Sequence, residues 1–173
     1  MRRLYSIYFI LIALAFPQSG LAALGESIKT FQDKNRKRIE LKEILIRDEK
    51  KYYSFNILVD ENELVMAPGF KVGMTVTVTA GKISGQSLAI SCGSNPMEGN
   101  RLAVDQCYKF ACESLGREAS ANAVEISLVQ QAVFLAYSNM PQVLKFPDTT
   151  GKIVFKTEKK GDEIILLVAA LKK

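Results

Sequence analysis

Residues 74–79 read Met74-Thr75-Val76-Thr77-Val78-Thr79, and this stretch alternates strictly between apolar and hydroxyl side chains. A period of two is typical of a β-strand with one buried face. We therefore expect Val76 and Val78 to face the core together with Met74, while the threonines share the other face. Gly81 follows where a tight turn needs it, and residues 87–92 supply a returning strand. The stretch predicts an antiparallel hairpin at the centre of a β-rich fold.

Short extended segments separated by turn residues occupy most of the remaining chain. They are rich in β-branched and aromatic side chains, and Pro68-Gly69 is one of the turns between them. Besides the hairpin, the segments expected as strands are 39–46, 52–59, 64–66, 101–108, 152–157 and 164–171. The last segment is apolar but only eight residues long, so we interpret it as a strand and not as a membrane span.

Residues 121–138 depart from this pattern. Apolar side chains recur there at spacings of three and four, which predicts an amphipathic helix with Ser120 or Asn122 as its N-cap. Pro141 would prevent the helix from continuing. We expect a mainly β, sandwich-like domain of about seven or eight short antiparallel strands with one α-helix, spanning residues 38–173. A polar, flexible arm over residues 23–37 would precede it.

The N-terminus has the three parts of a secretory signal peptide. Arg2 and Arg3 form a positive region, residues 4–16 form an apolar region, and Gly20 and Ala22 satisfy the small-residue rule at a cleavage site. We expect removal of residues 1–22, no permanent membrane span, and a periplasmic or extracellular protein. The alternative is a retained anchor, but the apolar run is too short to cross a bilayer.

The three cysteines are Cys92, Cys107 and Cys112. Because an exported protein meets an oxidising compartment, we expect one structural disulfide. Cys107–Cys112 is the preferred pair provided that the segment between them turns, and Cys92–Cys107 is the rival. Three buried free thiols and one reactive thiol are the remaining alternatives.

The sequence offers no recognisable catalytic, metal-binding or cofactor-binding motif. It contains no histidine, which excludes Ser-His-Asp and Cys-His catalysis and every His-ligated metal or haem. No glycine-rich phosphate-binding loop is present, and the carboxylates cluster in expected turns. We therefore expect a protein that is not an enzyme and needs no cofactor.

One short basic run and one aromatic residue are candidates for an interaction surface. The run includes Lys34, Arg36, Lys37 and Arg38, which is too small a footprint for nucleic-acid binding. A solvated turn is expected there, and contact with a partner or an anionic surface is the alternative. Phe70 follows the Pro68-Gly69 turn and is expected on an exposed loop.

The order Pro68-Gly69, residues 71–78 and Gly81-Lys82 resembles the middle of the invasion-associated locus B proteins. Cys107 and Cys112 would stand for that family's closely spaced cysteine pair. Residues 124–137 and 151–155 would match its C-terminal part. The chain departs from the family because it has no Trp, no cysteine before Cys92, and Ala111 where a glycine is expected. The resemblance implies an exported, mainly β envelope protein connected with host-cell entry, and it carries over no catalytic residue.

The leading functional expectation is an exported, non-catalytic envelope or secreted binding protein that interacts with a protein partner. The second is an accessory or structural subunit of an envelope assembly, in which an exposed edge strand such as 164–171 would pair with a neighbour. An enzyme of unrecognised class is the least favoured reading.

Overall fold

The structure is a computed structural model that describes residues 24–93, 96–117, 119, 122–146, 151–161 and 163–171. The expected signal peptide and the candidate cap Ser120 lie outside these residues. The described residues form one seven-stranded antiparallel sheet in the order β1-β2-β3-β4-β7-β6-β5. The strands are β1 (Ile39–Arg47), β2 (Lys50–Ile57), β3 (Phe70–Thr79), β4 (Lys82–Cys92), β5 (Gln142–Leu144), β6 (Lys152–Lys160) and β7 (Glu163–Leu171). The mainly β fold class with seven antiparallel strands is therefore confirmed, but the described residues contain four helices where one was expected.

The hairpin of β3 and β4 forms as the alternation predicts. Met74 lies opposite Leu88 and Val76 opposite Gln86, and the chain turns at Ala80 and Gly81, which both have positive φ. Met74, Val76 and Val78 are buried, whereas the threonines between them are only half-buried. The predicted orientation of this strand is confirmed.

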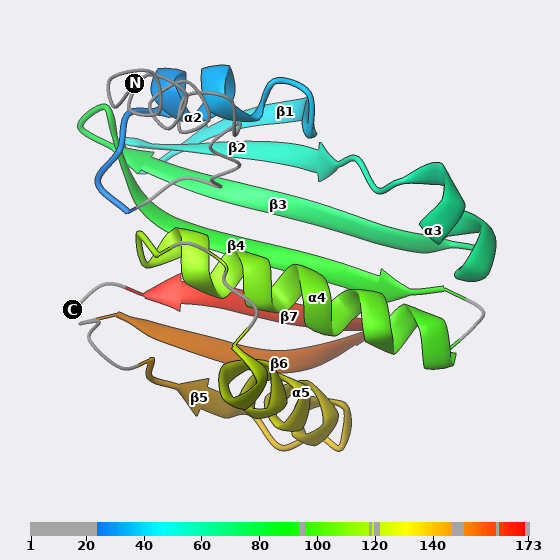
Figure 1. Ribbon diagram of the computed structural model, residues 1–173. Helices are drawn as coiled ribbons and strands as arrows, with labels where there is room; N and C mark the ends of the chain where they lie inside the picture. The colour runs from blue at the N-terminus through cyan, green and yellow to red at the C-terminus, as the bar shows by residue number, and fades with distance from the viewer. Residues whose placement is uncertain are drawn as a thin grey trace, which may run out of the picture.

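Helices cover one face of the sheet. Figure 1 shows α4 (Pro96–Ser114) lying in front of β4 and β7, and α5 (Ala123–Tyr137) beside it in front of β6 and β5. The sheet curls, so that its buried side chains meet those of the helices in one core. The largest fully buried side chains include Phe110 of α4, Phe155 of β6 and Ile90 of β4.

The expected helix at 121–138 is present as α5. Asn122 is its N-cap, because the Asn122 side chain accepts hydrogen bonds from the backbone N–H groups of Val124 (3.1 Å) and Glu125 (3.3 Å). The described helices include none that is both long and apolar enough to cross a membrane.

Three expectations about local structure were wrong. Residues 101–108 belong to α4 and not to a strand. The buried pair Leu102 and Ala103 recurs four residues later as Gln106 and Cys107, which is the spacing of a helix and not of a strand. Residues 64–66 belong to the short helix α3 (Glu61–Met66), which Asp60 caps by accepting from the Asn62 backbone N–H (2.8 Å). The segment 164–171 is not an edge strand, since β7 lies between β4 and β6.

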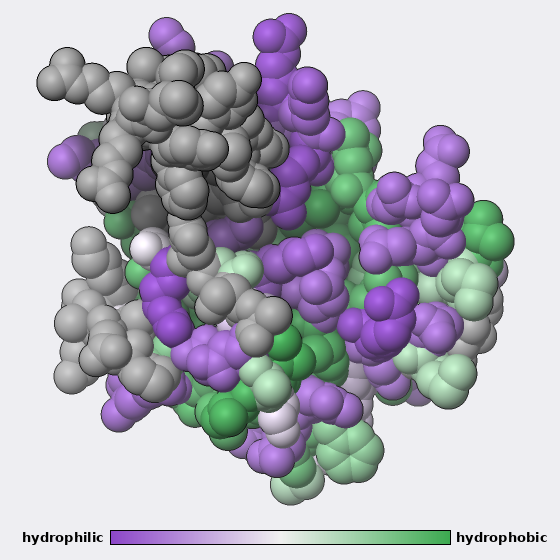
Figure 2. All heavy atoms as spheres, in the orientation of Figure 1, coloured by the Kyte–Doolittle hydropathy of each residue, from purple (hydrophilic) through white to green (hydrophobic). Residues whose placement is uncertain are grey.

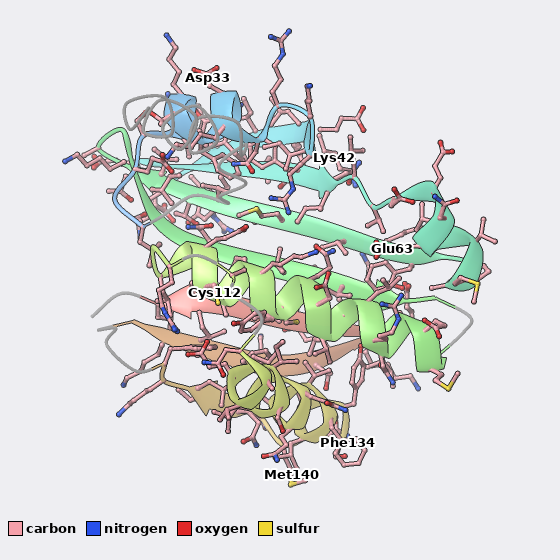
Figure 3. The ribbon with its side chains drawn as sticks, viewed as in Figure 1. Asp33, Lys42, Glu63, Cys112, Phe134 and Met140 are labelled. Atoms are coloured by element: carbon pink, nitrogen blue, oxygen red, sulfur yellow. The ribbon has the colours of Figure 1, made fainter. Side chains whose placement is uncertain are left out.

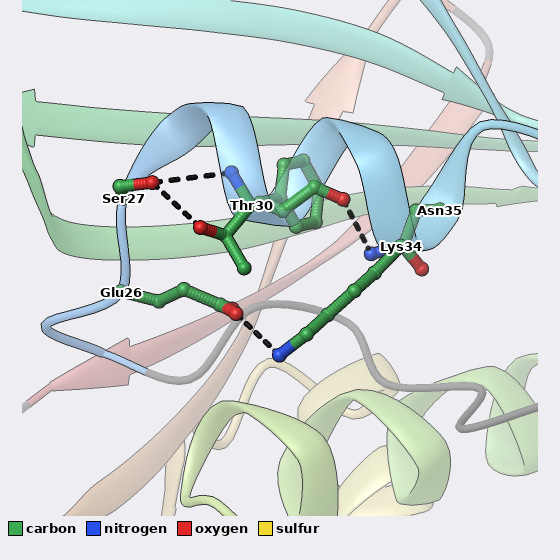
Figure 4. Close-up of polar contacts among 6 residues, drawn as sticks. Glu26, Ser27, Thr30, Lys34 and Asn35 are labelled. Carbon is green, nitrogen blue, oxygen red and sulfur yellow. Dashed lines mark hydrogen bonds and ion pairs between the residues drawn. The ribbon is translucent and has the colours of Figure 1, made fainter.

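Part of the expected polar arm is a helix, α2 (Ile28–Asn35). Ser27 caps it by accepting from the Thr30 backbone N–H (3.1 Å), as Figure 4 shows. The ring of Phe31 is fully buried and meets Phe55 of β2 edge to face at 5.4 Å. Residues 28–35 are therefore packed on the sheet and do not form a flexible arm.

Candidate functional site

A groove of about 1170 Å³ runs between α4 and α5. Side chains of the N-terminal half of α4 form one wall, side chains of α5 form the other, and the adjoining ends of β4 and β7 form the floor. Its apolar and aromatic lining residues are Met97, Val104, Tyr108, Ile126, Val133, Phe134, Tyr137 and Ile164. A concave, mainly apolar site of this size is typical of a ligand-binding site.

Two large apolar side chains stand at the rim of the groove with little cover. Met97 of α4 is 76% exposed and Phe134 of α5 is 70% exposed. Figure 3 shows Phe134 projecting from α5 into solvent, and Figure 2 shows apolar surface exposed among polar side chains over this part of the molecule. Ile164, at the start of β7, is also exposed. Exposed apolar side chains that gather around one concavity indicate a binding surface.

The floor of the groove holds a small polar cluster around Cys92. The Cys92 Sγ lies 2.8 Å from the Tyr137 hydroxyl oxygen and 3.5 Å from Asn100 Oδ1. Burial raises the pKa of both the Cys92 thiol and the Tyr137 hydroxyl. Both groups are therefore protonated near neutral pH, and the cluster links side chains of α4, α5 and β4.

Acidic and basic side chains border the groove. Glu163 accepts a hydrogen bond from the Ser91 hydroxyl, and Arg101 pairs with Glu98 (2.8 Å) on α4. Asp105 pairs with Lys109 one turn further along (2.7 Å). The rim thus carries both signs of charge around an apolar interior.

A second polar cluster joins α4 to α5 beyond the groove. The Tyr108 hydroxyl donates to Glu125 Oε2 (3.2 Å), while Arg117 Nη2 donates to Glu125 Oε1 (2.7 Å). The Arg117 guanidinium also lies 5.5 Å from the centre of the Phe146 ring. Burial, followed by the neighbouring Cys112 and Glu125, raises the pKa of Tyr108 to about 12. The cluster links α4 to α5 through side-chain contacts.

The predicted disulfide was wrong. All three cysteines are free, and Cys107 and Cys112 are both buried in α4. Residues five apart on a helix point about 140° away from each other, which separates their sulfur atoms. The rival partner Cys92 is also unbonded, and it lies instead beside Tyr137.

The residues expected to form an interaction surface do not come together. Lys34 pairs with Glu26 (Figure 4) and Arg38 lies 3.7 Å from Glu113 of α4, while Arg36 and Lys37 are exposed. Phe70 was expected on an exposed loop, but it is only 3% exposed because it is the first residue of β3 and faces the core.

No group of three or more His, Cys, Asp or Glu side chains with the arrangement of a metal site occurs in the described part of the chain. The groove residues are thus the main site feature that the sequence did not predict. The sequence does contain a pattern that places the α4 residues of the groove on one helix face. Met97, Asn100, Arg101, Val104 and Tyr108 recur at spacings of three and four.

Comparison with known proteins found no matching family model, no match among curated proteins and no matching solved structure. The resemblance to the invasion-associated locus B proteins stays a prediction.

Proposed function

We propose that the protein is an exported, non-catalytic binding protein, and that the groove between α4 and α5 binds a molecule with a single acyl chain. The observation that carries the proposal is the groove itself, about 1170 Å³ in volume and lined mainly by apolar and aromatic side chains. Export is supported by the N-terminal pattern of Arg2, Arg3 and the apolar run that follows.

The shape of the groove favours an elongated apolar ligand. The lining residues of α4 extend from Met97 to Tyr108 and those of α5 from Ile126 to Ser138, so each wall is three turns long. An acyl chain lying between these walls would cover the half-buried side chains of Val104 and Ile126 and the exposed ring of Phe134. Each methylene removed from water contributes about 0.8 kcal/mol.

The charged rim suits a molecule with a polar end. Arg101, Asp105 and Glu163 all lie at the border of the groove and stay accessible to water when the interior is filled. A polar head group at the rim would keep its hydration, so that only the acyl chain of the ligand is desolvated. A free thiol with a raised pKa at the floor fits a binding role better than a catalytic one.

Titration with the fluorescent fatty acid cis-parinaric acid tests the proposal. The protein is purified from the envelope fraction, where loss of residues 1–22 by intact mass would mark export. We expect saturable binding of one molecule per chain, with a Kd on the order of 1–10 µM. Phe134→Asp places a charge beside the acyl chain and should raise the Kd at least about tenfold.

Val124→Asp is the matched control. Val124 lies on the same helix, is also 70% exposed and does not line the groove. Its substitution should leave the Kd unchanged. Absence of saturable binding, or equal Kd values for the two variants, would contradict the proposal. Binding of an amphipathic helical peptide without binding of the fatty acid would instead assign the groove to a protein partner.

The second candidate function is that of a subunit in an envelope assembly. One observation favours it: β1 is a long edge strand whose side chains are mostly exposed. Such an edge can pair with another chain.

A further inference from the structure

Strand β1 forms one open edge of the sheet. It is nine residues long, and within the described residues it pairs with β2 alone. Four of its apolar side chains are exposed: Leu41, Ile44, Leu45 and Ile46, the last at 73%. At the other edge β5 has only three residues. Long apolar edges are unusual in stable proteins because their free N–H and C=O groups can template pairing with another chain.

The turn between β1 and β2 decides which backbone groups of β1 face outward. Arg47 lies opposite Lys50 across the two-residue turn Asp48-Glu49, and both turn residues have positive φ. In such a hairpin the residues that flank the turn bond to each other, and the pattern then alternates along the strand. Arg47 and Leu45 therefore direct their N–H and C=O groups at β2, whereas Ile44 and Ile46 direct theirs at the open edge.

We propose that the β1 strands of two copies of this chain pair antiparallel about a two-fold axis at Leu45, which joins their sheets. In this register Leu45 lies opposite Leu45 of the second copy, and Ile44 lies opposite Ile46. Since Ile44 and Ile46 carry the outward backbone groups, each such pair can form two backbone hydrogen bonds.

The charges of the strand agree with this register. Glu43 of each copy lies opposite Arg47 of the other, which gives two cross-strand pairs of opposite charge. A two-fold axis at Glu43 would place two glutamates opposite each other, and an axis at Ile44 would leave Glu43 opposite a leucine. Charges on an edge strand usually oppose pairing, but here they favour one register.

The apolar side chains agree as well. Ile44 lies opposite Tyr53 of β2, so Ile44 and Ile46 extend the face of the sheet that carries Phe55 and the helices. Joining two copies would bring four isoleucines together on that face and two leucines on the other. The pairing would remove from water the side chains that are exposed in one copy.

Exchange of the charges tests the register. We expect sedimentation velocity of the exported protein, over about 10 µM to 1 mM, to show a concentration-dependent dimer. Glu43→Arg and Arg47→Glu each place like charges opposite each other twice, and each should weaken the dimer at least about tenfold. The double variant Glu43→Arg/Arg47→Glu restores both pairs and should restore the dimer.

Each variant is checked for folding by its urea midpoint, and Lys159→Glu controls for the change in net charge. Lys159 is exposed near the end of β6, so its substitution should leave the dimer unchanged. Leu45→Lys places two lysines on the axis and should also dissociate the dimer. A wild-type monomer at the highest concentration, a double variant that stays monomeric, or a dimer lost in Phe134→Asp but kept in Leu45→Lys would each overturn the proposal.

Discussion

Val76 and Thr77 are adjacent in β3, and their side chains lie on opposite faces of the sheet. Val76 is fully buried under the helices, whereas Thr77 is half-buried on the face that the helices leave bare. Val76→Asp would bury an unpaired carboxylate, so we expect a loss of more than about 4 kcal/mol in the free energy of unfolding. Thr77→Asp should cost less than about 1 kcal/mol.

Urea unfolding of the two variants compares the faces directly. Two equally damaging substitutions would show that the threonine face is also covered, for example by a second chain. This would favour the assembly-subunit function.

At the residue scale, regular alternation was informative and isolated residues were not. The alternation of Met74–Thr79 predicted the burial of each side chain, because every second residue of a strand shares a face. The exposure of Phe70 was harder to predict, since Phe70 follows a turn and its exposure depends on where the next element packs. The structure buries Phe70 in β3 and exposes Met97 at the groove.

At the scale of elements, the close contact between α4 and β4 is the feature that the sequence did not predict. A Cβ atom added at Gly99 would lie 2.1 Å from the backbone oxygen of Cys92, so the helix approaches the strand more closely than any other residue allows. The sequence predicted a strand over residues 101–108 and no helix around Gly99, which lies in a stretch rich in glycine, serine and asparagine. The groove wall on α4 was missed for the same reason.

Gly99→Ala should therefore push α4 away from β4. We expect it to lower the free energy of unfolding by more than about 2 kcal/mol, although alanine is the better helix former. The measurement is urea unfolding beside Gly85→Ala, whose added Cβ would make only an ordinary contact of 3.7 Å with Thr77. A Gly99→Ala protein as stable as the wild type would disprove this close packing.

At the scale of the whole molecule, one face of the curled sheet is covered by helices and the groove opens on that side (Figure 1). The sequence predicted six of the seven strands and α5, but not β5, and it also predicted strands at 64–66 and 101–108, where the structure has helices. The order of the strands, and with it the open edge at β1, depends on contacts between distant segments that no local pattern specifies.

The buried thiols give the whole fold a pH dependence. Burial raises the pKa of Cys92, Cys107 and Cys112 above the ordinary value of 9.0, so the folded chain keeps protons that the unfolded chain releases. Their contribution to stability is complete below about pH 8 and is lost as the pH rises through and above 9. Each thiol contributes a loss of up to about 1.4 kcal/mol per pH unit.

Urea unfolding under reducing conditions at about pH 7 to 10 measures this slope. Cys107→Ala removes one fully buried thiol and should make the decline shallower. A stability that stays constant up to about pH 10 would contradict the burial of these groups.

Methyl NMR of protein labelled at methionine tests most directly whether the groove between α4 and α5 binds an acyl chain. Met97 lies at the groove, Met74 lies in the core under the sheet and Met66 lies on α3. On addition of a saturating medium-chain fatty acid, we predict a large shift of the Met97 methyl signal and unchanged signals from Met74 and Met66. A bound fatty acid that leaves the Met97 signal unmoved would contradict the account.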